Sequence, residues 1–164
     1  MSENINIYGL TPRDRSKRDS QYYYKESKRL RKEVLTLADK LKEHPKRFSI
    51  SNGIEMDVEI TKSDLKTIAS KMTQDNKFNA IKNALAKDIE GYLKKAKYIG
   101  WRPTIQGKHA EAVYFAYYNR LLGARSYLCM RKMHNSGFFK PYAIIDEDTF
   151  SNEIGSVRKD KPPK

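Results

Sequence analysis

Two histidines and one arginine have the greatest capacity for catalysis in this sequence: His109, His134 and Arg131. The ordinary pKa of imidazole is about 6.5, so a histidine can take up or release a proton near neutral pH. Metal-independent cleavage of an RNA phosphodiester needs a base, an acid and a cation beside the phosphate. We expect the three residues to fill these roles if the fold brings them to one end of a sheet. The alternative is that both histidines are surface residues.

Basic side chains outnumber acidic ones throughout the chain. The sequence has 33 Lys and Arg against 20 Asp and Glu, a formal charge of +13. This balance favours a polyanionic partner, with RNA or another nucleic acid ahead of an anionic membrane surface. A solubilising surface is the alternative. The expected nucleic-acid contacts are Lys108, Arg120, Arg125, Lys132 and Tyr117 near the histidines, and Arg13, Arg15, Lys17 and Arg18 near the N-terminus.

Other chemistries lack their residues in this sequence. It contains no Gly-rich phosphate loop, no Cys/His metal spacing and no Gly-x-Ser-x-Gly turn. We therefore expect no cofactor and no metal. The single cysteine, Cys129, falls in a predicted strand, where a buried structural thiol is the expected role.

A predicted antiparallel meander must position the histidines. Its strands are 113–119, 126–133 and 138–145, which are rich in aromatic and β-branched residues and are separated by turn residues. Pro141 donates no backbone hydrogen bond, so the third strand is expected to be an edge strand or to be kinked there. Such a sheet needs helices to cover its apolar face.

A basic amphipathic helix is predicted over 21–44, ended by Pro45. Its apolar stripe is Leu30, Val34, Leu37 and Leu41, with Lys and Arg on the other positions. A stripe this narrow also suits packing against another chain. A protein partner or a homodimer through the Leu30–Leu41 helix therefore remains open.

The middle of the chain predicts a hairpin followed by two short helices. Asn52-Gly53 is the preferred pair for a type I′ turn. Thr61 and Asp64 form a capping box for the first helix. Its buried stripe is Leu65, Ile68, Ala69 and Met72, and that of the second helix is Phe78, Ile81, Ala84, Leu85 and Ile89. The stretch 100–103, Gly-Trp-Arg-Pro, is predicted to be a turn.

These elements predict an α+β fold, with short helices packed on an antiparallel β-meander and preceded by the basic amphipathic helix. The predicted parts are a basic disordered arm at 1–20, the helix at 21–46, the α+β domain at 47–150 and a disordered tail at 151–164. No apolar run is long enough to span a membrane, and the N-terminus lacks the apolar core of a signal peptide. We expect a cytoplasmic protein.

Four features resemble the barnase, EndoU, colicin and RelE-like nuclease superfamily, in the compact forms of phage and mobile-element polyvalent proteins. They are "VEITKSDLKTIASK", "YIGW", a histidine ahead of an aromatic strand, and "GFFKPYAI", all within about 54–148. The resemblance implies a small endoribonuclease acting as a toxin or mobile-element effector. Many relatives look as though they carry a histidine on the first helix, whereas 65–71 here contains none. The alternative is thus a catalytically inactive nucleic-acid or protein-binding module, such as an inhibitor of a host nucleic-acid machine.

Overall fold

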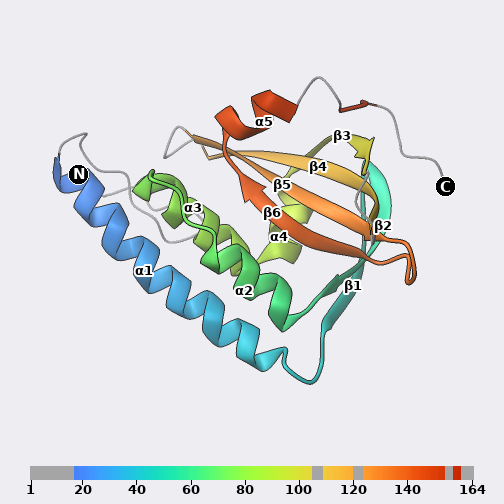
Figure 1. The fold of residues 1–164 in the computed structure, drawn as a ribbon, viewed down its shortest axis with the longest axis horizontal. Coiled ribbons are helices and arrows are strands. Elements are labelled where there is room, and N and C mark those ends of the chain that lie inside the picture. The colour runs from blue at the N-terminus through green and yellow to red at the C-terminus, as the bar shows by residue number, and fades with distance from the viewer. Residues whose placement is uncertain (1–16, 105–108, 120–123, 154–156, 160–164) are drawn as a thin grey trace.

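The computed structural model describes residues 17–104, 109–119, 124–153 and 157–159. They form an α+β fold in which helices cover a six-stranded sheet (Figure 1). The helices are α1 (Lys17–Lys40), α2 (Lys62–Ser70), α3 (Asn76–Ala86), α4 (Ile89–Lys95) and α5 (Glu147–Glu153). The strands are β1 (Lys46–Asn52), β2 (Ile54–Ile60), β3 (Lys97–Pro103), β4 (His109–Asn119), β5 (Ala124–Met133) and β6 (Phe139–Ile145).

The predicted meander is confirmed as β4, β5 and β6, and β3 extends it on one side. On the other side, β2 pairs with β6 in parallel through Val58 and Phe139, which brings the β1–β2 hairpin into the same sheet. The strand order is β1-β2-β6-β5-β4-β3, so the sheet is mixed and larger than the predicted one. Local alternation of residues does not reveal pairing between strands this far apart in the chain.

The β1–β2 hairpin forms where predicted, but its turn is not type I′. The strands pair Asn52 with Ile54, so the hairpin is centred on Gly53. Gly53 has φ 77°, and none of the described residues other than glycine has positive φ, whereas type I′ requires it at both central residues. The Asn52 amide instead donates to the carbonyl oxygens of Leu93 (2.6 Å) and Ala96 (2.7 Å), at the end of α4.

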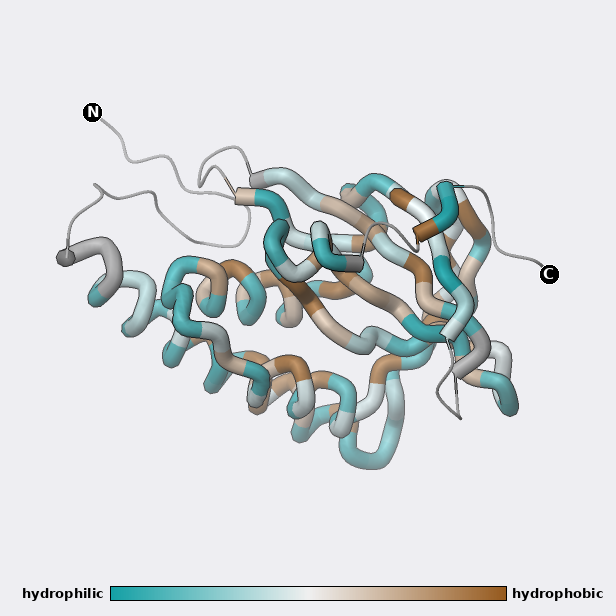
Figure 2. The backbone as a smooth tube through the Cα atoms, turned by 45° about the horizontal axis from the view of Figure 1, so that its top comes forward, coloured by the Kyte–Doolittle hydropathy of each residue, from teal (hydrophilic) through white to brown (hydrophobic). Residues whose placement is uncertain are grey.

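Helix α1 is confirmed, although it begins and ends four residues before the predicted 21–44, and its apolar stripe packs within this chain. Leu30 and Val34 are fully buried in the main core, and Leu37 and Leu41 pack partly against it. Hydrophobic residues gather between the helices and the sheet, while the outward turns of α1 are hydrophilic (Figure 2). A partner protein would therefore have to contact a different face of α1.

The helices after the hairpin differ from the prediction in their ends. The Thr61–Asp64 capping box of α2 is present. Met72 lies beyond the end of α2 with 54% of its surface exposed, so its predicted burial is wrong. Asp88 caps a separate helix, α4, where one continuous helix was predicted. The predicted turn at 100–103 is wrong as well, because these residues belong to β3.

The second face of the sheet carries a smaller core. Tyr114 and Tyr127 project from this face and pack on Phe150 of α5, whose ring stacks on Tyr127 at 4.0 Å between centroids. Cys129 is buried in the same cluster, as predicted. Among the described residues, the helices are all too short or too polar to cross a membrane.

Candidate functional site

The predicted catalytic residues lie at one end of β4 and β5. His109 opens β4, and its backbone pairs with that of Met133, the last residue of β5. His134 follows directly in the exposed turn between β5 and β6. The two histidine backbones are thus close neighbours, as the two-histidine hypothesis requires. The side chain of His109 lies outside the described residues.

Arg131 and Lys132 point to opposite faces of the sheet, because successive residues alternate along a strand. Arg131 lies on the face that carries α5 and is only 8% exposed. Lys132 lies on the other face, where its Nζ is 3.7 Å from the carboxylate of Glu111. Burial raises the pKa of Glu111, and Lys132 partly opposes that rise. One phosphate therefore cannot contact both cations directly.

The remaining predicted contacts are dispersed. Arg125 is near the start of β5, at the opposite end of the strand from Arg131. It borders a surface hollow together with four carboxylates, those of Asp75, Asp146, Glu147 and Asp148. Tyr117 packs against Tyr92 at 5.9 Å between ring centroids. Lys17 and Arg18 are in the first turn of α1, but their side chains lie outside the described residues, as do Lys108, Arg120, Arg13 and Arg15 altogether.

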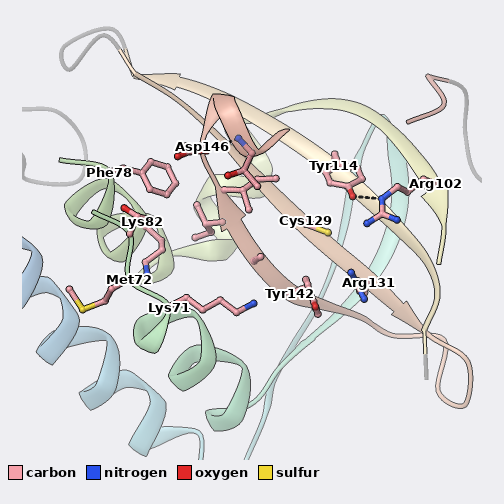
Figure 3. Close-up of a pocket in the computed structure, with 15 residues that line it drawn as sticks. Lys71, Met72, Phe78, Lys82, Arg102, Tyr114, Cys129, Arg131, Tyr142 and Asp146 are labelled. Atoms are coloured by element: carbon pink, nitrogen blue, oxygen red, sulfur yellow. Dashed lines mark hydrogen bonds between the residues drawn. The ribbon is translucent and has the colours of Figure 1, made fainter. Parts of the chain in front are cut away.

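Arg131 borders a cavity of about 250 Å³ beside β6 (Figure 3). The cavity lies between β6 and the segment that connects α2 to α3, where β6 has separated from β2. Four cationic side chains line it, from α3, β3, β5 and the residue that follows α2. These are Lys71, Lys82, Arg102 and Arg131. Among the described lining residues, Asp146 has the only carboxylate.

Two tyrosines hold three of these cations. The guanidinium carbon of Arg131 lies 3.5 Å from the centroid of the Tyr142 ring, and Lys71 Nζ lies 4.7 Å from it. Tyr142 is the extra residue of a β-bulge opposite Cys129 and Met130, next to Pro141, where an edge strand or a kink was predicted. The order of the strands places β6 between β2 and β5, so it is not an edge strand of the sheet. Arg102 Nε donates a 2.6 Å hydrogen bond to the Tyr114 hydroxyl.

Lys82 is the fourth cation, and it is buried. It lies on α3, a helix whose residues 78–86 are all buried. Only 2% of the surface of Lys82 is exposed. Its Nζ has no hydrogen-bond partner among the described residues. Burial, together with the positive charges of Arg31 and Lys71, lowers the pKa of Lys82 to about 8.

Hydrogen bonds fix the connection between α2 and α3, which forms one wall of the cavity. The Asn79 side-chain oxygen accepts from the Thr73 amide (2.9 Å), and the Asn79 amide donates to the Thr73 carbonyl oxygen (2.9 Å). Asp75 caps α3 by accepting from the Phe78 amide (3.1 Å). This network ties the segment that follows Lys71 to α3, the helix that carries Lys82.

A second cationic surface continues from the cavity. It is a groove between the end of α1 and the exposed face of α2, whose cationic side chains are Lys42, Lys62, Lys66 and Lys71. Lys71 borders both the groove and the cavity. Lys62 Nζ lies 3.0 Å from Asp39 Oδ1, and this contact lowers the pKa of the Asp39 carboxyl. We call this surface the α1–α2 groove.

Sequence reasoning found Arg131 but not Lys71, Lys82 or Arg102. The available signal was Lys82, which lies four residues after Phe78 and three before Leu85, on the same face of the predicted helix as these apolar residues. Arg102 was assigned to a turn, and Lys71 was noted only as part of a stretch without histidine. Their proximity depends on the separation of β6 from β2, which is a property of the tertiary structure.

The arrangement can bind an anion and offers little for a metal. Among the described residues there is no group of three or more His, Cys, Asp or Glu side chains that could hold a metal ion.

Comparisons with models of protein families, with curated proteins and with solved structures find no match. The site's own chemistry therefore carries the functional argument.

Proposed function

We propose that this protein binds RNA or another single-stranded nucleic acid, with a phosphate group in the cavity beside β6. The observation that carries the proposal is the lining of that cavity, four cations against one carboxylate. Arg and Lys contacts to phosphate supply most of the affinity of sequence-independent nucleic-acid binding. The formal charge of +13 supports the same partner.

A flexible single strand suits this site better than a duplex does. A cavity of about 250 Å³ has room for a small group, and only an unpaired strand can insert one nucleotide without breaking base pairs. The exposed groove with Lys42, Lys62 and Lys66 gives the adjoining phosphates a place on the surface. The cavity and the groove together offer a path for several nucleotides.

The test is binding of fluorescent single-stranded RNA by the Arg131→Gln variant. Loss of a guanidinium–phosphate contact should weaken binding by about tenfold or more. Lys95→Gln is the matched control, because Lys95 is exposed on α4 and borders neither the cavity nor the groove. Equal losses in the two variants, or no RNA binding by the wild type at low salt, would reject the proposal.

A metal-independent endoribonuclease is the second candidate. It is favoured by the backbone pairing of His109 with Met133, which brings His109 next to His134, and by the resemblance of the sequence to the nuclease superfamily. In this mechanism one imidazole takes the proton of a ribose 2′-hydroxyl and the other protonates the departing 5′-oxygen. Arg131 would then stabilise the charge that develops on the phosphate.

Incubation with RNA in EDTA tests this candidate. We expect cleavage by the wild type, and a loss of at least about a hundredfold in His109→Ala and in His134→Ala. His44→Ala, in which an exposed histidine is replaced, should cleave as the wild type does. Intact RNA with every protein, accompanied by salt-sensitive binding, would leave the catalytically inactive module as the function.

A further inference from the structure

Lys82 is the most unusual charged residue among those that the structure describes. A buried ammonium group normally pairs with a carboxylate, because water no longer compensates its charge. The neighbours of Lys82 are instead positive, Arg31 and Lys71, and its Nζ has no hydrogen-bond partner among the described residues. An arrangement of this kind is suited to an anion that enters from outside.

The charge around the cavity exceeds what one internal phosphodiester would neutralise. A phosphodiester within a strand carries one negative charge, whereas a phosphomonoester carries roughly 1.5 to 2 at pH 7. Lys71, Lys82, Arg102 and Arg131 surround the cavity with only Asp146 to oppose them among the described lining residues. A phosphomonoester therefore matches the site better.

The size and the walls of the cavity suit one small organic ligand. Its volume of about 250 Å³ is just below the roughly 300–1,000 Å³ of typical small-molecule sites. Phe78 and Ile144 give it apolar walls beside the cations, and Met72 borders it at the surface. An inorganic anion alone would leave these apolar groups uncovered, whereas a nucleoside would cover them.

We propose that the cavity binds a nucleoside phosphomonoester, with Lys82 and Lys71 on the phosphate and Phe78 and Ile144 against the nucleoside. The inference concerns the same cavity as the proposed function. It rests on that function where the bound nucleotide is the end of an RNA strand. Two sources share this chemistry: a free mononucleotide, and the terminal nucleotide of an RNA strand. In the second case the α1–α2 groove receives the rest of the strand, because Lys71 borders both surfaces.

The experiment compares ligands that differ only in a phosphate. The oligonucleotide arm measures the binding of one RNA decamer with a 5′-phosphate, with a 3′-phosphate or with hydroxyl ends. The mononucleotide arm compares uridine 5′-monophosphate and uridine 3′-monophosphate with uridine. For the wild type we expect a phosphate to strengthen binding about tenfold or more in at least one arm.

Lys82→Met removes the buried charge and keeps a side chain of similar length. It should abolish the phosphate-dependent gain, so the variant should bind the phosphate-ended and the hydroxyl-ended decamers with affinities within about twofold of each other. If Lys82→Met folds poorly, Lys71→Met replaces it in the test, because Lys71 is exposed and its replacement should not disturb the fold. Lys71→Met should reduce the phosphate-dependent gain in affinity about tenfold. Lys95→Met should keep the full gain.

Each outcome separates this inference from the proposed function. A gain with decamers indicates a strand terminus, and a gain with mononucleotides alone indicates a free nucleotide; both support the inference. If RNA binds, but neither a terminal phosphate on the decamer nor the phosphate of a mononucleotide strengthens binding, the inference is overturned and RNA binding stands. If a mononucleotide binds through its phosphate but RNA does not, RNA binding is rejected and the cavity assignment stands.

Discussion

Burial of a single lysine, Lys82, lowers the stability of this fold. Folding lowers the pKa of Lys82 from its ordinary 10.5 to about 8, mainly through burial. At about 1.4 kcal/mol for each pKa step, the charged form costs the folded protein about 3 kcal/mol at most. A buried lysine at such a cost is easier to explain by binding than by stability.

Lys82→Met should therefore raise the melting temperature at pH 7 by several degrees, measured by scanning calorimetry. Below pH 8 both the folded and the unfolded wild type hold the proton, so the full cost is present. Between pH 8 and 10.5 the folded state loses the proton first, so the wild type gains stability relative to the variant. The advantage of the variant should thus be greatest below pH 8 and nearly absent at pH 10.5.

Lys95→Met is the control for this comparison and should melt as the wild type does at every pH. A Lys82→Met protein that melts below the wild type at pH 7 would contradict the account. Such a result would mean that the ammonium group stabilises the folded state through a contact with another part of the chain.

At the scale of elements, local sequence patterns predicted each strand of the meander, the helix α1 and the cap of α2. These features depend on residues a few positions apart, such as Thr61 and Asp64. The turn at Asn52-Gly53 was predicted less well, because the Asn52 side chain caps α4 and holds its backbone out of the left-handed region. A contact with a helix some 40 residues away cannot be read from a dipeptide.

Asn79 is the residue that couples the α2–α3 connection to the cavity. Asn79→Ala removes the acceptor of the Thr73 amide and of the Thr73 hydroxyl, and it should destabilise the protein by about 1–3 kcal/mol. Hydrogen exchange of the Thr73 amide should become faster, and RNA affinity should fall because Lys71 is no longer held beside the cavity.

Gln74→Ala is the matched control, because Gln74 is an exposed residue of the same connection. It should leave both stability and RNA affinity nearly unchanged. If Asn79→Ala loses stability while its RNA affinity stays at the wild-type value, the connection supports the fold without organising the site.

For the whole molecule, the sequence predicted the class of fold and the sign of the charge, but not where the charge is concentrated. The α+β class follows from elements that are each visible locally. The cavity requires residues from α3, β3, β5 and the end of α2 to meet. They meet because β6 pairs with β2 only at Phe139 and Val58 and then separates from it. The predicted site followed neighbouring residues of one strand, and the alternation of that strand separates Arg131 from Lys132.

The salt dependence of RNA binding measures how much of the surface takes part. Affinity for a single strand falls with salt with a slope of about 0.7 for each phosphate contacted, in log–log form. If the strand follows the α1–α2 groove, replacement of Lys42, Lys62 and Lys66 by Gln should lower this slope by about 2. Replacement of Lys94, Lys95 and Lys97 removes the same charge elsewhere and should change the slope by less than about 1. Equal changes in the two triple variants would show that the long-range field of the protein, and not a strand lying in the groove, governs binding.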